Sequence, residues 1–195
     1  MLSRKELSRQ RAEEIYATAG QILCQMGYEK ASIRDIAAAT GMTKAGLYYY
    51  FSSKEELLFI ILDGYMDQLL AGIDQLQKSV SDPEERLKAY INFQVQLYCR
   101  DVHGSKLIIH DENCLSGEWH RIIKDKQRAY LVYWRDALEA YCRQTGKELP
   151  FPSAHVMLLV GLCNWIYQWY DPQGPLPPDQ LAELIFQRFF RGFSG

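Results

Sequence analysis

Residues 32–54, SIRDIAAATGMTKAGLYYYFSSK, constrain the fold more than any other stretch, because they carry three helix signals in close succession. Ser32 and Asp35 form a Ser-x-x-Asp capping pattern, which satisfies free N–H groups at a helix start. Gly41 tolerates the left-handed conformation at which such a helix stops sharply. Thr43 can cap a second, short helix, and a further capping pair opens a third. The stretch therefore predicts two short helices joined by a tight turn, followed at once by a longer helix.

The second of these helices has the composition of a surface that reads DNA. Leu47 is its one large aliphatic residue, so we expect it to anchor the helix in the core. Lys44 can reach a base edge or a phosphate, Gly46 permits close approach, and the hydroxyl of Tyr48 can donate to a phosphate oxygen. Lys54 lies where the third helix starts, and the free N–H groups of a helix N-terminus attract anions.

The residues alone leave a second interpretation open, because helix-turn-helix shapes occur in proteins that bind no DNA. The aromatic run from Tyr48 to Phe51 could equally be part of a core. A family resemblance favours the first interpretation. The segment from Gly27 to Leu57 resembles the DNA-binding domain of TetR-family transcriptional regulators. The resemblance is carried by Gly27-Tyr28, Ser32-Ile33-Arg34-Asp35-Ile36-Ala37, Gly41-Met42-Thr43-Lys44, Leu47-Tyr48-Tyr49-Tyr50-Phe51 and Lys54-Glu55-Glu56-Leu57.

This resemblance implies which residues contact DNA, with one departure from the family pattern. Tyr50 stands where many relatives carry histidine, so its contact is left out of the set. The positions that match DNA-contacting residues are Arg34, Thr43, Lys44, Ala45, Gly46, Tyr48, Tyr49 and Lys54.

The charge of the chain is nearly balanced and does not by itself indicate nucleic acid. The net charge is −2, and residues 1–56 carry eight Lys/Arg against seven Asp/Glu. This fits a small basic face on a larger acidic body. The chain shows no apolar run long enough to span a bilayer and no signal-peptide core near its start, so we expect a cytoplasmic protein with no membrane partner.

Cysteine and histidine usage indicates no metal site, cofactor or disulfide frame. The five cysteines are scattered, with no Cys-x-x-Cys pair, and read as reduced thiols. His110-Asp111-Glu112 could ligate a metal, although a solvated role is the stronger expectation. No catalytic motif is recognisable. An all-α enzyme or binding protein acting on acyl thioesters, through Cys114 or His110, stays open as an alternative, as does a helical adaptor whose DNA head has lost function.

All strong periodicity in the chain is helical, which predicts an all-α fold of about nine helices. Residues 1–56 form the expected helix-turn-helix DNA-binding domain, and residues 57–195 the expected ligand-binding and dimerisation domain. Besides the pair within residues 32–49, the expected helices span about 4–26, 54–78, 83–100, 102–113, 116–145, 153–170 and 178–192.

The last two expected helices carry more apolar surface than one chain can cover. The stretch SAHVMLLVGLCNWIYQWY is apolar almost all the way round, which indicates burial on more than one side. A core within one chain is the alternative. We expect a two-fold homodimer with a four-helix bundle built from these two helices of each chain, and the family resemblance also implies a homodimer. Two heads could then reach successive major grooves of a palindromic operator, about 34–36 Å apart.

The aromatic residues of the body suggest a site for a small hydrophobic effector. Aromatic residues at helical spacing are more often core, but pockets between helices bind small molecules. The stretch from Gly161 to Phe193 resembles the C-terminal region of TetR-family regulators that respond to acyl-CoA thioesters. The resemblance is carried by Asn164-Trp165, Trp169-Tyr170 and Gly174-Pro175-Leu176, and the Arg128-x-Tyr130 segment agrees with it. By this resemblance the candidate ligand-binding residues are Phe93, Leu97, Trp119, Ile123, Arg128, Tyr130, Trp134, Trp165 and Trp169, with Arg121 and Lys124 also near the nucleotide phosphates. The expected protein is a repressor that such an effector releases from DNA.

Overall fold

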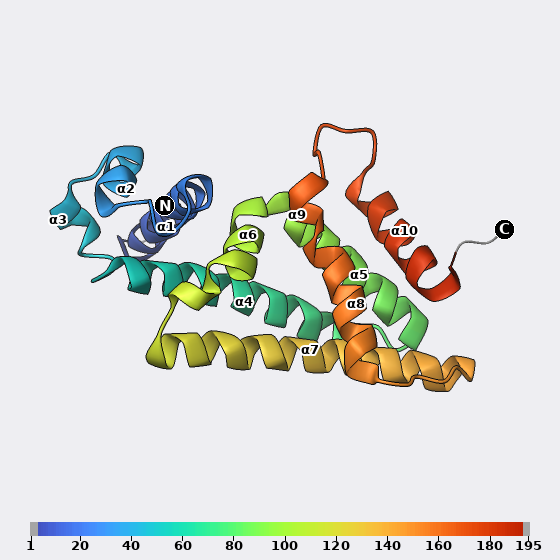
Figure 1. Ribbon diagram of the computed structural model, residues 1–195. Coiled ribbons are helices and arrows are strands. Elements are labelled where there is room, and N and C mark those ends of the chain that lie inside the picture. Colours follow the sequence, from blue (N-terminus) through green and yellow to red (C-terminus); the bar gives the residue numbers. More distant parts are fainter. Residues whose placement is uncertain (1–3, 193–195) are drawn as a thin grey trace. The chain divides into compact units, whose positions relative to one another are not determined.

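The structure, a computed structural model, describes residues 4–192 and is helical in this part of the chain, with no strand (Figure 1). The predicted all-α class is confirmed. No helix of the described residues is both long enough and apolar enough to cross a membrane. The helices are α1 Arg4–Met26, α2 Ile33–Thr40, α3 Lys44–Leu47, α4 Lys54–Ser79, α5 Pro83–Arg100, α6 Val102–His110, the 3-10 turn η1 Glu112–Cys114, α7 Gly117–Thr145, α8 Pro152–Asn164, α9 Ile166–Trp169 and α10 Pro178–Arg191.

Local chemistry explains where several of these helices begin and end. The carboxylate of Asp82 accepts a hydrogen bond from the Glu85 N–H at 2.9 Å, and Pro83 occupies the first turn of α5, where its missing N–H costs nothing. Gly27 and Gly146 have positive φ values of 81° and 66° just after α1 and α7. Because residues other than glycine rarely adopt positive φ values, these two glycines end α1 and α7.

The helix expected over residues 153–170 is divided in the structure. α8 ends at Asn164, Trp165 links the two pieces, and α9 continues for a single turn. The helix expected over 102–113 ends at His110 and is followed by η1. Neither interruption contains a glycine or proline, so no local breaker in the sequence announces them.

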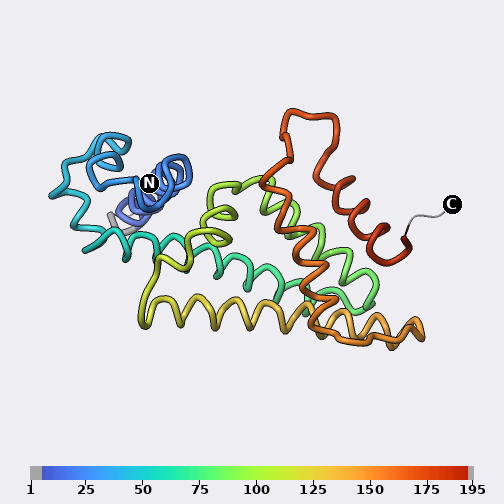
Figure 2. The backbone as a smooth tube through the Cα atoms, in the orientation of Figure 1, coloured from blue at the N-terminus to red at the C-terminus, as the bar shows by residue number. Residues whose placement is uncertain are grey.

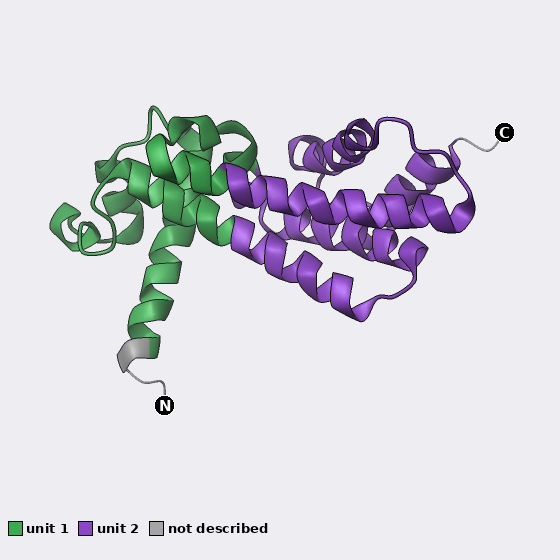
Figure 3. Ribbon diagram, turned by 90° about the horizontal axis from the view of Figure 1, so that it is seen from below, with its two compact units in different colours: residues 1–65, 106–123 green, residues 66–105, 124–195 purple. Residues whose placement is uncertain are grey.

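Figure 3 shows that the described residues form two compact units. Unit 1 contains the chain up to Tyr65 together with residues 106–123, and unit 2 contains residues 66–105 and everything from Lys124 onward. In unit 1, α1 packs against α2, and α2 against α3. Its core includes the fully buried side chains of Ile15, Leu23, Ile36, Leu47 and Leu57.

Unit 2 has its own core, in which α5 is the central element. The loop that follows α9 turns the chain back, so that α10 lies beside α5 (Figure 2). The buried face of α10 is formed by Leu181, Ala182, Ile185 and Phe186. The apolar face that the last helix was expected to offer to a second chain is therefore largely used within unit 2.

Candidate nucleic-acid interface and ligand-binding body

The first helix of the helix-turn-helix is built by the capping pair that the sequence predicts. The Ser32 hydroxyl accepts from the Asp35 N–H at 3.3 Å, and the Asp35 carboxylate accepts from the Ser32 N–H at 2.8 Å. The Ser32 hydroxyl also donates to the Asp35 carboxylate at 2.6 Å, and this bond, followed by that from the Ser32 N–H, lowers the pKa of the Asp35 carboxyl. At the other end of α2, Gly41 is left-handed at φ 65°, and its N–H donates to the carbonyls of the last turn. The turn into α3 therefore has a fixed geometry.

The short helix α3 presents its polar and aromatic residues outwards from a single buried anchor. Leu47 is fully buried, as expected. The Thr43 hydroxyl accepts from the Gly46 N–H at 3.1 Å and so caps the helix. Tyr49 is 82% exposed and Tyr48 is 52% exposed. The side chains exposed to solvent on α3, on its two caps and at the residue that follows are Thr43, Lys44, Ala45, Tyr48 and Tyr49.

Gly46 and the residues after Tyr49 are constrained by the protein itself. A Cβ added at Gly46 would lie 3.2 Å from the Met42 Cε. The hydroxyl of Tyr16 donates to the Tyr50 carbonyl at 3.2 Å, and Phe51 is buried. The aromatic run thus divides, because two of its tyrosines face solvent whereas Phe51 belongs to the core.

Lys54 is held by the turn between α1 and α2. Its ammonium donates to the carbonyls of Tyr28 at 2.8 Å and Ala31 at 3.1 Å, with a longer contact to Glu29 at 3.4 Å, and it lies 4.3 Å from the centroid of the Tyr28 ring. Burial, followed by neighbouring carboxylates, raises the pKa of Tyr28 to about 12. An ammonium has three N–H donors, so this side chain is committed to protein carbonyls. Arg34, in contrast, is exposed on α2.

The structure divides the expected ligand-binding residues between the two units. Trp119 and Ile123 lie in unit 1, where Trp119 stacks on Phe59 with centroids 5.5 Å apart and Ile123 is fully buried. The residues that lie in unit 2 are Phe93, Leu97, Arg128, Tyr130, Trp134, Trp165 and Trp169.

Three of the unit 2 candidates share the interior of that unit. Leu97, Tyr130 and Trp134 are buried, and the rings of Tyr130 and Trp134 have centroids 6.2 Å apart. Burial raises the pKa of Tyr130 well above its usual value. Phe93 packs on α4, where its ring lies so close to Gly72 that an added Cβ would be 2.0 Å from it. These contacts bring aromatic rings together in the interior of unit 2.

The other unit 2 candidates lie on the surface. Trp165 is 59% exposed, and Trp169 is 52% exposed. Arg128 forms an exposed ion pair with Asp125 and borders a groove of 250 Å³ between α7 and α8. Arg121, in unit 1, contacts Glu118 at 3.5 Å. Within unit 2, the Arg128 guanidinium is therefore exposed and paired with Asp125, whereas the aromatic residues Tyr130 and Trp134 are buried.

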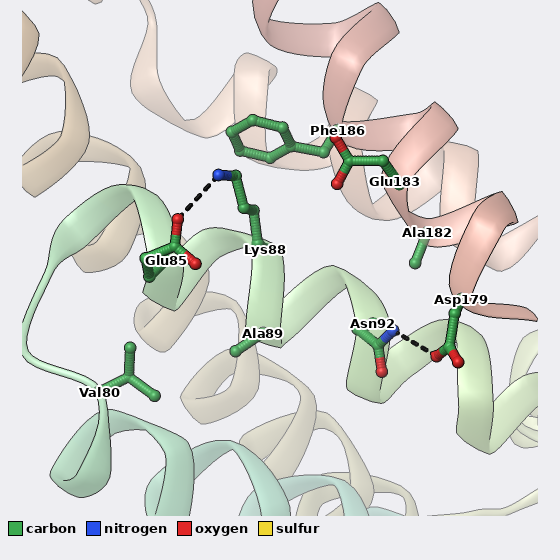
Figure 4. A pocket seen from close by; sticks show the side chains of 9 residues that line it. All are labelled: Val80, Glu85, Lys88, Ala89, Asn92, Asp179, Ala182, Glu183 and Phe186. Carbon is green, nitrogen blue, oxygen red and sulfur yellow. Dashed lines mark hydrogen bonds and ion pairs between the residues drawn. The ribbon is translucent and has the colours of Figure 1, made fainter.

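A second groove, of 330 Å³, lies between α5 and α10 (Figure 4). Its polar groups already bind one another: Lys88 pairs with Glu85 at 2.8 Å, and the Asn92 amide donates to Asp179 at 2.9 Å. The Lys88 ammonium also lies 5.1 Å from the centroid of the Phe186 ring. The polar side chains of this groove therefore bind one another, and they connect α10 to α5. Within residues 4–192, no cluster of three His, Cys, Asp or Glu residues could hold a metal ion.

Two polar residues of this interior were not predicted as functional. The side chains of Gln94 and Asn164 are hydrogen-bonded to each other inside unit 2, at 2.9 Å. One weak sequence signal could have identified Gln94: it is a polar residue at a position of α5 where the helical spacing predicts an apolar one.

Comparison with known proteins identifies the class to which this fold and this exposed helix belong. Residues 15–60 match the family model described as bacterial regulatory proteins, tetR family, and residues 80–193 match the model described as tetracyclin repressor-like, C-terminal domain. The chain belongs to the TetR family of bacterial transcriptional regulators. The family and the curated relatives are regulators and not enzymes, which excludes the enzyme alternative based on Cys114 or His110.

Three similar proteins are described either by a bound ligand or by whether they repress or activate transcription. AibR, solved in complex with isovaleryl coenzyme A and operator DNA, is 32% identical, with a TM-score of 0.83 over 94% of this chain and 100% of that one. The transcriptional repressor KstR2 of Mycobacterium tuberculosis is 25% identical over 89% of this chain and 88% of its own length. The transcriptional activator FasR of Mycolicibacterium smegmatis is 29% identical over 95% of this chain and 84% of its own length. The resemblance to the acyl-CoA-responsive branch of the family is confirmed.

Proposed function

We propose that this protein is a repressor that binds a palindromic operator as a homodimer and leaves the DNA when a small hydrophobic effector, an acyl-CoA, binds to the body. The observation that carries the proposal is the outward-facing polar surface of α3 on a fully buried Leu47. Residues 1–56 bind DNA, and residues 57–195 bind the effector and the second chain.

The proposed contacts on DNA follow from which groups are exposed. Lys44 reaches a base edge or a phosphate, Ala45 contacts a thymine methyl group, and the hydroxyls of Tyr48 and Tyr49 donate to phosphates. Lys54 contacts a phosphate through its backbone N–H in the first turn of α4, because its ammonium is used by the turn at Tyr28. The remaining predicted contacts, Arg34, Thr43 and Gly46, lie on α2 or on α3 and its cap.

The proposed dimer interface is the outer face of α8, with a contribution from α10. Large apolar side chains stand exposed at helical spacing along α8, and an exposed Gly161 among them allows a second helix to approach closely. A contiguous exposed apolar face of this kind is typical of an interaction site. The exposed apolar residues of this face are Met157, Leu158, Leu162 and Trp165 on α8, with Trp169 after them and Leu184 on α10.

The effector assignment is supported by the relative AibR, whose structure contains isovaleryl coenzyme A. The aromatic interior of unit 2, with Leu97, Tyr130 and Trp134, offers apolar surroundings to an acyl chain. The sign of regulation follows KstR2, which is a repressor. A useful release requires the effector to favour the form that does not bind DNA by about 1–3 kcal/mol of coupling free energy.

Mobility shifts with the DNA upstream of the protein's own gene test the two halves of the proposal separately. We expect a shifted band that is lost on addition of an acyl-CoA, with isovaleryl-CoA and palmitoyl-CoA as short and long probes and free CoA as the control. If the protein binds no upstream sequence, the proposal that it is an operator-binding regulator is wrong. Binding that no acyl-CoA changes would refute only the effector.

The dimer has its own test, with a matched control on the same chain. Leu158→Glu places a charge on the α8 face and should convert the protein to monomers in sedimentation experiments. Leu7→Glu makes the same change at an exposed leucine of α1, 53% exposed against 63% for Leu158, and should leave the dimer intact. Equal behaviour of the two variants would show that the α8 face is not the interface.

A further inference from the structure

A chain of four polar side chains crosses the otherwise apolar interior of unit 2. The Tyr130 hydroxyl on α7 donates to the Gln94 Oε1 on α5 at 2.9 Å. The Gln94 Nε2 donates to the Asn164 Oδ1 at the end of α8, also at 2.9 Å. The Tyr98 hydroxyl on α5 donates to the same Asn164 oxygen at 2.6 Å. The bonds therefore tie three helices together at one place.

The Gln94 amide is the link between the two halves of this hydrogen-bonded network. Its oxygen accepts from Tyr130 and its nitrogen donates to Asn164. The Asn164 Oδ1 holds two donors at once. Gln94 is fully buried, and Tyr98 and Tyr130 are 3% and 5% exposed, so water cannot replace a lost partner easily. Loss of one hydroxyl would disturb its neighbours along the chain.

The chain of bonds ends at the point where the expected long helix is interrupted. Asn164 is the last residue of α8, and Trp165 follows it with φ −79° and ψ −10° before α9 begins. The Trp165 N–H still donates to the Gly161 carbonyl at 3.1 Å, so the break is small in its backbone. No glycine or proline causes it. The side-chain bonds of Asn164 to α5 lie at this junction, beside the fully buried Cys163 and Ile166.

The same junction carries the exposed tryptophans. Trp165 follows Asn164 directly, and Trp169 lies four residues further on, both more than half exposed. Trp165 continues the exposed apolar row that includes Leu158 and Leu162 of α8. The orientation of this row at its C-terminal end depends on where the backbone of Asn164 is held.

We propose that Asn164 is the positioning residue of the α8–α9 junction, and that the bonds from Tyr130, Gln94 and Tyr98 set the orientation of the tryptophan face through which two copies associate. The inference rests on the homodimer of the proposed function. It links the buried hydrogen-bonded network to the dimer face. A change in the interior of unit 2 therefore alters how well the two protomers fit together.

A pair of tyrosine substitutions on α5 tests this inference in the full-length protein. Tyr98 and Tyr90 are both buried, and each hydroxyl donates to a side-chain amide oxygen at 2.6 Å, that of Asn164 and that of Gln77 respectively. Tyr98→Phe and Tyr90→Phe should each lower Tm by about 2–4 °C, because each removes one hydrogen bond. Only Tyr98→Phe should also raise the dimer Kd, by about tenfold, in sedimentation experiments.

Two further variants keep the test decisive if Tyr98→Phe folds poorly. Asn164→Leu removes the shared acceptor and should weaken the dimer in the same way, whereas Asn164→Asp retains an oxygen that accepts from both donors and should restore most of the affinity. With 5-fluorotryptophan, the ¹⁹F signals of Trp165 and Trp169 should shift in Tyr98→Phe and Asn164→Leu, and that of Trp119 should not.

The outcomes separate this inference from the proposed function. A dimer Kd that changes equally in Tyr98→Phe and Tyr90→Phe, with unmoved Trp165 and Trp169 signals, overturns the role of Asn164 and leaves the dimer standing. A wild-type chain that stays monomeric at all concentrations overturns both.

Discussion

The polar side chains that matter in unit 1 lie on the outside, whereas those of unit 2 lie within. Lys44 on α3 and the two tyrosines that follow the helix, Tyr48 and Tyr49, are exposed around one buried anchor, Leu47. In unit 2, Gln94 and Tyr130 form their hydrogen bonds inside the core. An exposed site can be altered without disturbing the fold. In a buried site, every substitution also alters the packing of the core. Such a site is suited to transmitting a conformational change and not to reading a DNA sequence.

The largest expected effect compares two glycines of the same helix, one in each unit. Gly72→Ala should destabilise the protein by about 1–3 kcal/mol, because overpacking a core forces side chains to move; its Cβ would lie 2.0 Å from the Phe93 ring. Gly64 has nothing within 4 Å of an added Cβ, so Gly64→Ala should stabilise α4 by about 0.5–1 kcal/mol. Urea unfolding of the two variants measures both signs. If the two substitutions change the free energy of unfolding in the same direction, Phe93 does not pack against Gly72 as described.

The next effect concerns the outward-facing residues of α3. Lys44→Ala should weaken operator binding about tenfold and reduce the slope of log K against log salt by about 1, since one phosphate or base contact is lost. Tyr48→Phe should weaken binding less and leave the sequence preference unchanged, because phosphate contacts carry no sequence information. Fluorescence anisotropy at several salt concentrations measures both. If neither change alters affinity, α3 does not contact the operator.

Lys54 offers the contrast to Lys44 within unit 1. Lys54→Met removes the hydrogen bonds to the Tyr28 and Ala31 carbonyls and should cost about 1 kcal/mol of stability. Its salt slope for operator binding should match the wild type, because the ammonium releases no counterion from DNA. A slope reduced as in Lys44→Ala would show that this ammonium leaves the turn and binds phosphate.

The smallest effect is a pH dependence from the capping pair of α2. The pKa of Asp35 is lowered in the folded protein by its hydrogen bonds to Ser32. The stability that it supplies is therefore present above its unfolded pKa, about 3.9, and is lost as the pH falls through the lower folded value. Asp35→Asn should be less stable than the wild type at neutral pH, with the gap closing in acid. Ser32→Ala should show the same closure, and a gap independent of pH would contradict the pairing.

The two units also differ in how much of them the sequence predicts. Ser32, Asp35, Gly41 and Thr43 act through neighbours within a few residues, so their caps and the anchor Leu47 are readable from local pattern. The start of α5 follows the same logic, with Asp82 as its cap and Pro83 in its first turn.

The unpredicted features depend on contacts between distant residues. The break after Asn164 coincides with bonds to α5 from residues 66 and 70 positions away. The pairing of α10 with α5, the membership of residues 106–123 in unit 1 and the commitment of Lys54 to a turn near Tyr28 are of the same kind. No periodicity encodes which partner a helix face will find.

The design of α3 has a consequence for how such regulators diversify. A segment of four helical residues could not hold its shape alone, because helix nucleation is unfavourable in so short a peptide. Its shape comes from Leu47, the Thr43 cap and the turn at Gly41. Lys44 and Ala45 face outward and carry none of that burden. In the proposed role of α3, substitutions at these two positions would therefore change operator preference and leave the scaffold unaltered.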